Sequence, residues 1–569
     1  MSRRGTETLS VAARRLMPTL CLALALCGCG GDGVAGTGAD GATAADEVAT
    51  TDGTGAMGSA PGAMGGGAGG PKSFPHANLI VISLDTLRAD GLGTLGGPPN
   101  ISPVLDQFAA DSVVFTQARA AAPHTAPSHM SIFTGTFPSW HGVQNVQFGT
   151  DPRTGRDGPI IYPLRPEVPT MAEIFSAAGF TTLGLTDGGN VNKAHGFGRG
   201  FGEYTKELVG VERQIADAAE RIPQLASQDN RFFLFWHTYQ IHAPYVPPAK
   251  YRENWVPKTY DGPLTGVVEN LDGLTFAEKF GRMRDEFWVD REQFSWPEAA
   301  YLHGLYKAGI RSTDQQLTQL FTLLRTYGLL DTSVIVLLSD HGEEFFEHGK
   351  WQHEQLYEEC LRVPLMVRLP GGLHGGTRID VPVSLVDVLP TVLDLLEIDT
   401  GALDLPGPVQ LQGQSLAGAV VGDETLRPRP IVSELRQDSG GLGNTPGEGG
   451  GPNYDWMIAI HFNGMKFLHD QYRGKDAEHR DQALFDLTAD PAERKNVLAK
   501  RTDIAGHFTE QLDLYLAMLS FVEGGSAEIP DMSLEELEKL VALGYLSADQ
   551  YEQAKRAKEA EAAAGGDGG

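Results

Sequence analysis

The stretch Asn78-Leu-Ile-Val-Ile-Ser-Leu-Asp85 limits the fold more than any other part of the chain. It is an apolar run, rich in β-branched residues, that stops at a carboxylate. This predicts a buried parallel strand with Asp85 at its C-terminal end. Similar runs at residues 232–236 and 333–338 alternate with helical periods, which predicts an α/β fold with a mostly parallel central sheet flanked by helices. Open α/β sheets bind ligands at the C-terminal ends of their strands.

The rhythm of strands and helices is lost after about residue 396. Two later apolar runs, at residues 454–460 and 465–468, are separated by Asn463-Gly464, which predicts a β-hairpin. The Gly-rich residues 439–453 before it are expected to form a mobile loop. Helices are expected at residues 101–110, 169–178, 214–221, 299–327, 388–396, 534–546 and 551–564, and a further strand at residues 181–185.

A second stretch, Pro123-His-Thr-Ala-Pro-Ser-His-Met-Ser-Ile-Phe-Thr-Gly135, holds a cluster of hydroxyl groups and two histidines. A helix is expected to begin near Pro127. A hydroxyl at a helix N-terminus lies in positive potential, where an attacked phosphate or sulfate would also be held. Asp340 and His341 directly follow the strand run 333–338. They are therefore expected at the same edge of the sheet as Asp85.

Short strings along the chain follow one another in an order known from one protein family. They are Asp85-Thr-Leu-Arg-Ala-Asp90, Thr125-Ala-Pro-Ser-His129, Phe133-Thr-Gly135, Leu338-Ser-Asp-His-Gly-Glu343, Glu347-His-Gly349, Leu356-Tyr-Glu-Glu-Cys-Leu-Arg-Val-Pro364 and Leu484-Phe-Asp-Leu-Thr-Ala-Asp-Pro491. In this order they resemble the sulfatase branch of the alkaline phosphatase superfamily, from about Asn78 to Leu498. The resemblance implies a sulfatase-like α/β fold with a small antiparallel C-terminal subdomain.

By the same resemblance, Asp85, Asp340, His341 and the Thr125 oxygen form a site for one divalent metal ion. Such an ion would lower the pKa of the Thr125 hydroxyl and neutralise charge on the attacked group. Carboxylate and imidazole ligands favour Zn²⁺ or Mn²⁺ over Ca²⁺, which prefers oxygen ligands alone. The resemblance thus implies metal-dependent hydrolysis of a sulfate or phosphate ester, with Thr125 as the nucleophile.

The chain departs from the family at the nucleophile. Typical sulfatases have Cys-x-Pro-Ser-Arg, whose cysteine is converted to formylglycine, whereas this chain has Thr125-Ala-Pro-Ser-His129. Threonine does not undergo that conversion, so no formylglycine is expected. Superfamily members with a threonine nucleophile act mostly on phosphodiesters, phosphonates or lipid head groups, so phosphodiesterase and phosphonate hydrolase activities stay open. The rival functions are a transferase of phosphoryl head groups on the cell surface and an inactive pseudoenzyme that binds an anion.

Four histidines are further catalytic candidates, because imidazole titrates near neutrality and can donate a proton to a leaving alkoxide. By resemblance, His129 replaces the motif arginine and His242 matches a loop histidine near the leaving group. His348 and His353 lie close together in the sequence. They either contribute to a cationic histidine clamp beside one metal ion, which we favour, or bind a second metal ion together with His242.

An insertion at residues 245–296 is rich in aromatic side chains. These side chains either fill a local core beneath a loop or form a lid that binds a sugar or aryl leaving group. The expected substrate is a small-molecule or glycan ester of sulfate or phosphate. The net charge of −28 disfavours nucleic acid as a partner.

The N-terminal residues predict export. An apolar run from Leu16 to Leu26, preceded by arginines, is too short to span a bilayer and suits a signal-peptide core. Leu26-Cys-Gly-Cys29 resembles a bacterial lipobox, in which lipid-modified Cys29 anchors the protein to the outer membrane or cell surface; ordinary secretory cleavage is the alternative. The expected parts are a lipoprotein signal peptide (1–28), a Gly/Ala-rich disordered tether (29–72), a catalytic domain (73–430), a small C-terminal subdomain (431–500), and C-terminal helices with a disordered tail (501–569).

Overall fold

The computed structural model describes residues 71–150, 157–205, 207, 209–283, 286, 295–438, 454–472, 482–523 and 555–556. The expected signal peptide, the Cys29 site, most of the tether, the Gly-rich residues 439–453 and the helix expected at 534–546 lie outside this part of the chain. The helix expected at 551–564 also lies outside it, apart from two residues. No helix among the described residues is both long and apolar enough to cross a membrane.

The main sheet has eight strands in the order β13-β2-β12-β9-β1-β8-β6-β7. At its centre β1 is parallel to both β8 and β9, and β6 is parallel to β8 and β7. Only β12 runs against its neighbours, β2 and β9, so the described sheet is mostly parallel, as expected. The strands are β1 (Asn78–Leu84), β2 (Val113–Phe115), β6 (Thr181–Leu185), β7 (Glu203–Tyr204), β8 (Phe232–Thr238), β9 (Ser333–Leu338), β12 (Leu365–Arg368) and β13 (Arg378–Ile379).

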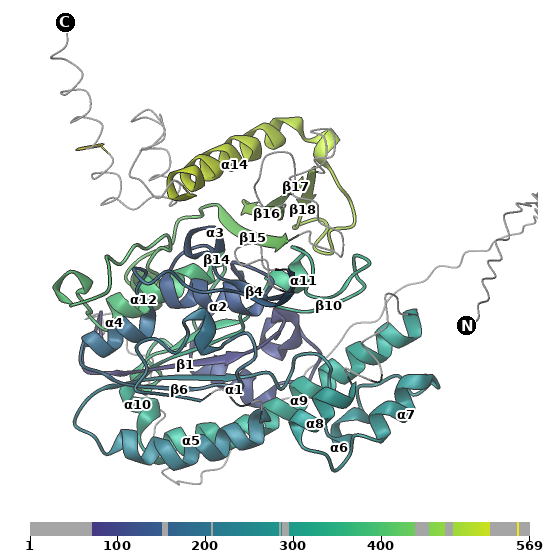
Figure 1. Ribbon diagram of the computed structural model, residues 1–569, viewed down its shortest axis with the longest axis horizontal. Coiled ribbons are helices and arrows are strands. Elements are labelled where there is room, and N and C mark those ends of the chain that lie inside the picture. The colour runs from purple at the N-terminus through teal and green to yellow at the C-terminus, as the bar shows by residue number, and fades with distance from the viewer. Residues whose placement is uncertain are drawn as a thin grey trace, which may run out of the picture. The chain divides into compact units, whose positions relative to one another are not determined.

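Helices cover both faces of this sheet, because the buried strands send alternate side chains to opposite sides. From β1, Leu79 and Val81 enter one apolar core, whereas Ile80 and Ile82 enter another. Figure 1 shows α2 and α12 on one side of β1 and α5 on the other. The first core is closed by α2 (Thr125–Thr134), α4 (Met171–Ala177) and α12 (Val388–Leu395), and the second by α1 (Pro103–Ala110), α5 (Gly210–Ala226) and α9 (Trp296–Thr326).

The expected elements that fall within the described residues are found, with differences of up to five residues at their ends, the largest at α5. β6 and β9 have the bounds that the sequence predicts, and β1 ends one residue before Asp85. α2 begins at Thr125, two residues earlier than expected. Pro127 is tolerated there because the N–H groups of a first helical turn have no partner within the helix.

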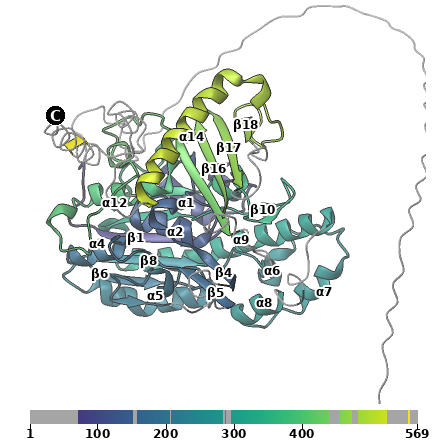
Figure 2. The same ribbon diagram turned by 45° about the horizontal axis from the view of Figure 1, so that its top comes forward.

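The predicted hairpin is part of a second, antiparallel sheet. It pairs β16 (Tyr454–Phe462) with β17 (Met465–Tyr472), and β15 (Ile431–Asp438) and β18 (Gln482–Asp486) flank this pair. Helix α14 (Thr502–Glu523) lies along the sheet in Figure 2 and contributes Phe508, Leu512 and Tyr515 to a third apolar core. The small antiparallel C-terminal subdomain is therefore confirmed.

The insertion at residues 245–296 contains α6 (Ala249–Arg252), α7 (Pro263–Glu269) and α8 (Phe276–Met283). Trp255, Tyr260 and Phe276 pack against the core between the sheet and α9, and the Tyr260 ring stacks on Tyr301 at 4.5 Å between centroids. For these side chains the structure favours a local core over a lid. Phe287 and Trp288 lie outside the described residues.

The remaining elements are short. Strand pairs join β3 (Ala118–Arg119) to β14 (Val383–Ser384), β4 (Gln144–Thr150) to β5 (Asp157–Tyr162) and β10 (Glu344–Phe345) to β11 (Trp351–Gln352). The short helices are α3 (Pro138–His141), α10 (Leu329–Thr332), α11 (Glu358–Leu361) and α13 (Ala417–Val420).

Candidate active site

Three neighbouring parallel strands bring polar side chains to one edge of the main sheet. Asp85 follows β1, Asp340 and His341 follow β9, and His237 is the penultimate residue of β8. Because β1 lies between β8 and β9 and runs parallel to both, these strand ends meet. All four side chains are fully buried. Residues separated by more than 250 positions thus share one small volume.

The N-terminal end of α2 meets the same edge. Thr125 is the first residue of the helix and is buried, with its Oγ1 atom 3.3 Å from His341 Nε2. One turn further along, Ser128 Oγ donates a hydrogen bond to the Asp340 carbonyl at 2.7 Å. This bond ties the helix to the loop after β9, so the hydroxyl of Thr125 is held beside the Asp-His pair.

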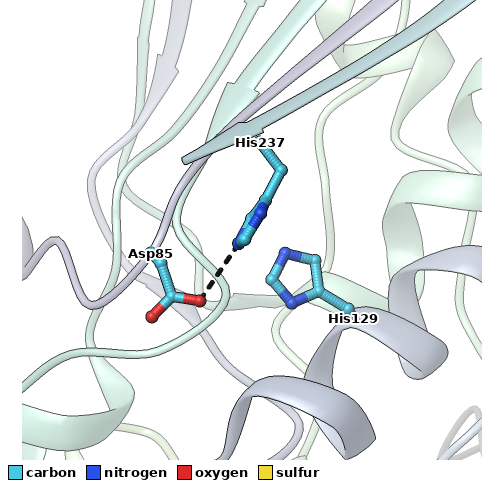
Figure 3. A group of neighbouring side chains, drawn as sticks. All are labelled: Asp85, His129 and His237. Atoms are coloured by element: carbon cyan, nitrogen blue, oxygen red, sulfur yellow. Dashed lines mark hydrogen bonds and ion pairs between the residues drawn. The ribbon is translucent and has the colours of Figure 1, made fainter. Parts of the chain in front are cut away.

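The two carboxylates each have an oxygen that accepts no hydrogen bond. Asp85 Oδ2 lies 3.2 Å from His237 Nε2 (Figure 3), whereas Asp85 Oδ1 is buried without a partner. Asp340 Oδ2 lies 3.2 Å from His129 Nδ1 and 3.3 Å from His341 Nε2, yet neither contact has hydrogen-bond geometry. Buried carboxylate oxygens without partners are costly unless a cation or proton balances them.

The carboxylate pKa values respond to this burial in opposite directions. Burial, followed by the neighbouring Asp340 charge, raises the pKa of Asp85 well above its ordinary value. Burial alone would also raise the pKa of Asp340, but the imidazoles of His341 and His129 outweigh it and lower that pKa. A divalent cation between the two groups would let both ionise.

His341 has an unprotonated nitrogen close to Thr125 and Asp340. Its Nδ1 atom lies 2.9 Å from the Gly342 carbonyl, which can only accept, so Nδ1 carries the proton. Burial lowers the pKa of His341 to about 4, and the ring is neutral near pH 7. Its Nε2 lone pair therefore faces Thr125 Oγ1 and Asp340. The ligand atoms of Asp85, Asp340 and His341 all lie within 4.8 Å of one another, which fits a divalent metal ion.

His129 and His237 lie beside Asp85, as Figure 3 shows. His129 Nδ1 lies 3.0 Å from the Thr125 carbonyl, and its Nε2 lies 2.9 Å from Ser83 Oγ. The two imidazole rings meet edge to face, with centroids 5.0 Å apart. His129 thus lies beside the expected metal site, buried among polar groups rather than open to a substrate. Together with Asp85 these rings form another group with ligand atoms within 4.8 Å.

His237 was missed by the sequence reasoning. The signal was present: a histidine directly follows the apolar run 232–236, and the strand continues to Thr238. A strand with every residue buried has no solvent for an imidazole, so this ring had to find a polar partner inside the protein.

His242 and His353 form a neighbouring pair. Their Nε2 atoms lie 3.4 Å apart, and the His353 ring lies 4.5 Å from the His341 ring. Burial lowers the pKa of His242, and lowers that of His353 well below its ordinary value. Both rings are therefore neutral near pH 7, which argues against the cationic histidine clamp that the sequence favoured.

The structure does not bring His348 together with these histidines. Its Nδ1 atom lies 2.6 Å from Glu359 Oε1, and its ring stacks on Tyr357 with 3.6 Å between centroids. The carboxylate raises the pKa of His348 against the opposing effect of burial. His348 therefore supports the loop that carries His353 rather than joining it at the site.

The chain is similar in sequence to known proteins. The sulfatase family model matches residues 77–398. Arylsulfatase K of Bos taurus is 22% identical over 503 residues, which cover 80% of this chain and 84% of that protein. The ulvan-active sulfatase of Formosa agariphila is 24% identical over 462 residues, which cover 74% of this chain and 77% of that protein.

Solved structures share the fold. The phosphonate monoester hydrolase of Agrobacterium radiobacter superposes with a TM-score of 0.57 at 19% identity and covers 77% of this chain and 94% of that chain. The phosphonate monoester hydrolase of Silicibacter pomeroyi superposes with a TM-score of 0.56 at 20% identity and covers 77% of this chain and 94% of that chain.

Proposed function

Since the chain belongs to the sulfatase family and is an ester hydrolase, we propose that it cleaves its ester with Thr125 as the nucleophile. The observation that carries the proposal is the position of Thr125 Oγ1, which lies 3.3 Å from His341 Nε2 at the meeting point of three strand ends. The ester is that of a sulfate, phosphate or phosphonate, because the attacked centre must be a tetrahedral oxyanion that the buried site can hold.

The residues that would hold a divalent ion are Asp85, Asp340 and His341, together with the Thr125 oxygen. Bound there, the ion supplies Lewis-acid stabilisation of the charge on the attacked group. Zn²⁺ and Mn²⁺ suit this mixture of carboxylate and imidazole better than Ca²⁺ does. The unpartnered Asp85 Oδ1 and Asp340 Oδ2 atoms support this assignment.

The protein itself prepares the nucleophile. Thr125 opens α2, and the positive end of the helix dipole favours the alkoxide form of its side chain. His129 Nδ1 contacts the Thr125 carbonyl, and Ser128 Oγ donates to the Asp340 carbonyl, so the first turn of α2 that carries the hydroxyl is held beside the Asp-His pair. Such positioning lowers the entropic cost of an in-line attack. No formylglycine takes part, because residue 125 is threonine.

The substrate is proposed to be a small molecule or glycan that carries the ester group. Sulfatases from Bacteroides thetaiotaomicron with the names Δ4,5-hexuronate-2-O-sulfatase and N-acetylglucosamine-6-O-sulfatase are 22% and 25% identical to this chain. Their names support a glycan ester. The likeness to phosphonate monoester hydrolases supports keeping phosphonates in any substrate screen.

We also propose that the protein is exported and held at a membrane through a lipid on Cys29. The support is the run Leu16 to Leu26 followed by Leu26-Cys-Gly-Cys29. In a detergent phase-partition experiment the natural chain should enter the detergent phase, and Cys29→Ser should stay in the aqueous phase. Equal partition of the two proteins would refute the anchor.

The nucleophile is tested with an ester panel of sulfate monoesters, phosphate monoesters, phosphodiesters and phosphonate monoesters, with Zn²⁺ or Mn²⁺ added. Thr125→Ala should slow release from the preferred ester at least about a hundredfold. Thr125→Ser, which keeps a hydroxyl, should retain more activity than Thr125→Ala. Equal rates for wild type and Thr125→Ala would exclude Thr125 as the nucleophile.

A further inference from the structure

We propose a second divalent-cation site beside the first, held by His124, His353 and Glu354. Each of these residues offers one ligand atom, and the three atoms lie within 4.8 Å of one another. None of the three belongs to the group formed by Asp85, Asp340 and His341.

The protonation of His242 determines which nitrogen of His353 carries no proton. His242 Nδ1 lies 2.5 Å from the Ala243 carbonyl, an acceptor only, so Nδ1 carries the His242 proton. His242 Nε2 is then an acceptor, and the facing His353 Nε2, at 3.4 Å, must be the donor. Because a neutral imidazole has one proton, His353 Nδ1 is left as a lone pair.

The lone pair on His353 Nδ1 indicates that this nitrogen binds a ligand. His353 is 8% exposed, and its Nδ1 atom is buried without a hydrogen-bond partner. A buried imidazole nitrogen whose other nitrogen is fixed by an outer partner is the usual arrangement of a metal ligand.

The donor set has the chemistry of an open zinc site. Two imidazoles and one glutamate are the ligands of catalytic zinc in several hydrolases, where the fourth position is left for water or substrate. The peptide that carries two of the ligands is held in place: Glu344 accepts hydrogen bonds from the Glu354 N–H and from Gln355 Nε2, both at 2.8 Å. A pre-positioned pair of ligands lowers the ordering cost of binding an ion.

This site adjoins the proposed nucleophile. His124 is the N-cap of α2 and directly precedes Thr125, and the His353 ring lies 4.5 Å from His341 and 5.4 Å from His124. An ion here would bind an oxygen of the group that Thr125 attacks, a role that rests on the proposed function. Two dications favour a doubly charged group, so a phosphate monoester dianion should gain more than a sulfate monoester, which carries one negative charge.

The test is the metal content of the full-length protein, stripped with a chelator and reloaded with Zn²⁺. Wild type should bind about two ions per chain at saturation. Glu354→Gln and His353→Gln should each retain one ion, with affinity for the second at least about tenfold weaker. Co²⁺ loading gives a second readout, because the visible absorption from the site with two histidines should be lost in both variants.

Matched variants separate this site from the first. Asp340→Asn should also lower the stoichiometry by one, and Asp340→Asn/Glu354→Gln should bind none. His507→Gln, a control on the exposed face of α14, should bind as wild type. If Asp340→Asn alone leaves the content unchanged while Glu354→Gln lowers it, the first site fails and this one stands. Unchanged Zn²⁺ stoichiometry and affinity in both Glu354→Gln and His353→Gln would overturn the second site. Circular dichroism verifies that the variants are folded.

Discussion

At the scale of single residues, two histidines contact the carboxylates of the proposed metal site. His237 Nε2 lies 3.2 Å from Asp85 Oδ2, and His129 Nδ1 lies 3.2 Å from Asp340 Oδ2. An imidazole N–H beside a metal-binding carboxylate orients it and sets its charge. The two histidines therefore act as positioning residues for the proposed metal site, and their effect is measurable on metal affinity without any substrate.

His237→Ala should weaken metal binding about 10- to 100-fold, because Asp85 Oδ2 then loses its hydrogen bond with the His237 imidazole. His237→Gln, which keeps an N–H donor, should recover part of the affinity. Titration of the chelator-treated protein with Mn²⁺ measures both constants. An affinity in His237→Ala equal to that of wild type would contradict the positioning role.

A pH effect is expected from His141, which lies outside the proposed metal sites. Its Nδ1 accepts from the Val143 N–H at 3.0 Å and its Nε2 lies 3.1 Å from the Pro127 carbonyl. Burial lowers its pKa to about 3. The folded protein therefore binds this proton less well than the unfolded chain, so the stability it contributes is complete above pH ~6.5 and is lost on acidification toward pH 3.

The expected size follows from about 1.4 kcal/mol per pH unit. Between pH 6.5 and pH 4, wild type should lose roughly 3 kcal/mol of unfolding free energy relative to His141→Asn. Denaturant unfolding of both proteins across this pH range measures the difference. The contributions of the other titrating groups are common to both proteins and cancel in that difference. A difference that stays constant with pH would refute the assignment.

At the scale of elements, Asp187 joins three of them behind the site. Its Oδ1 accepts from the backbone N–H groups of Val209 and Gly210 at the start of α5, each at 3.1 Å. Its Oδ2 accepts from Thr238 Oγ1 at 2.8 Å and from the Tyr239 N–H at 2.9 Å, at the end of β8. The position of His237 therefore depends on a carboxylate that follows β6.

Asp187→Asn should destabilise the protein by about 3 kcal/mol, because an amide places two donors among groups that already donate. Asp229→Asn, on the exposed loop between α5 and β8, should change the unfolding free energy by less than about 0.5 kcal/mol. Urea unfolding compares the two. If Asp187→Asn is as stable as Asp229→Asn, the hydrogen bonds to Asp187 do not hold these elements together.

At the scale of the molecule, a buried charge network joins the small antiparallel sheet to α11 and β3. Lys466 on β17 is fully buried, and its Nζ lies 2.7 Å from Glu493 Oε1 and 3.6 Å from Glu358 Oε1. Glu358 also pairs with Arg119 at 2.9 Å and with His461 at 2.7 Å. These contacts connect the antiparallel sheet to the segment after the histidine cluster.

Lys466→Ala should cost about 3 to 5 kcal/mol, since it leaves Glu493 buried without a cation. Lys466→Ala/Glu493→Ala should recover part of this loss, and Lys495→Ala, on the surface nearby, should have little effect. Thermal and denaturant unfolding measure these variants together with Glu493→Ala, the other single variant of the cycle. Additive losses in the double variant would show that the two residues are not coupled.

Much of the architecture could be predicted from local patterns. The strands around Val81 and Val336, the helix at Thr125 and the hairpin at Asn463-Gly464 follow from short runs of sequence, because periodicity, turn residues and helix starts act between near neighbours. The same runs end at Asp85 and Asp340, which explains why these carboxylates could be named as site residues. Helix and strand ends were less certain, since capping and packing decide them.

The amino-acid sequence by itself determined the fold class, a mostly parallel sheet flanked by helices, and the types of residue at the C-terminal edge of that sheet. Tertiary structure alone decided which distant groups meet: His237 beside Asp85, 152 positions away, and His353 facing His242 but not His348. The physical reason is that strand order and loop course set those distances, and no local interaction encodes them. The protonation of each imidazole depends on those contacts, and so does the number of metal ions that the cluster can hold.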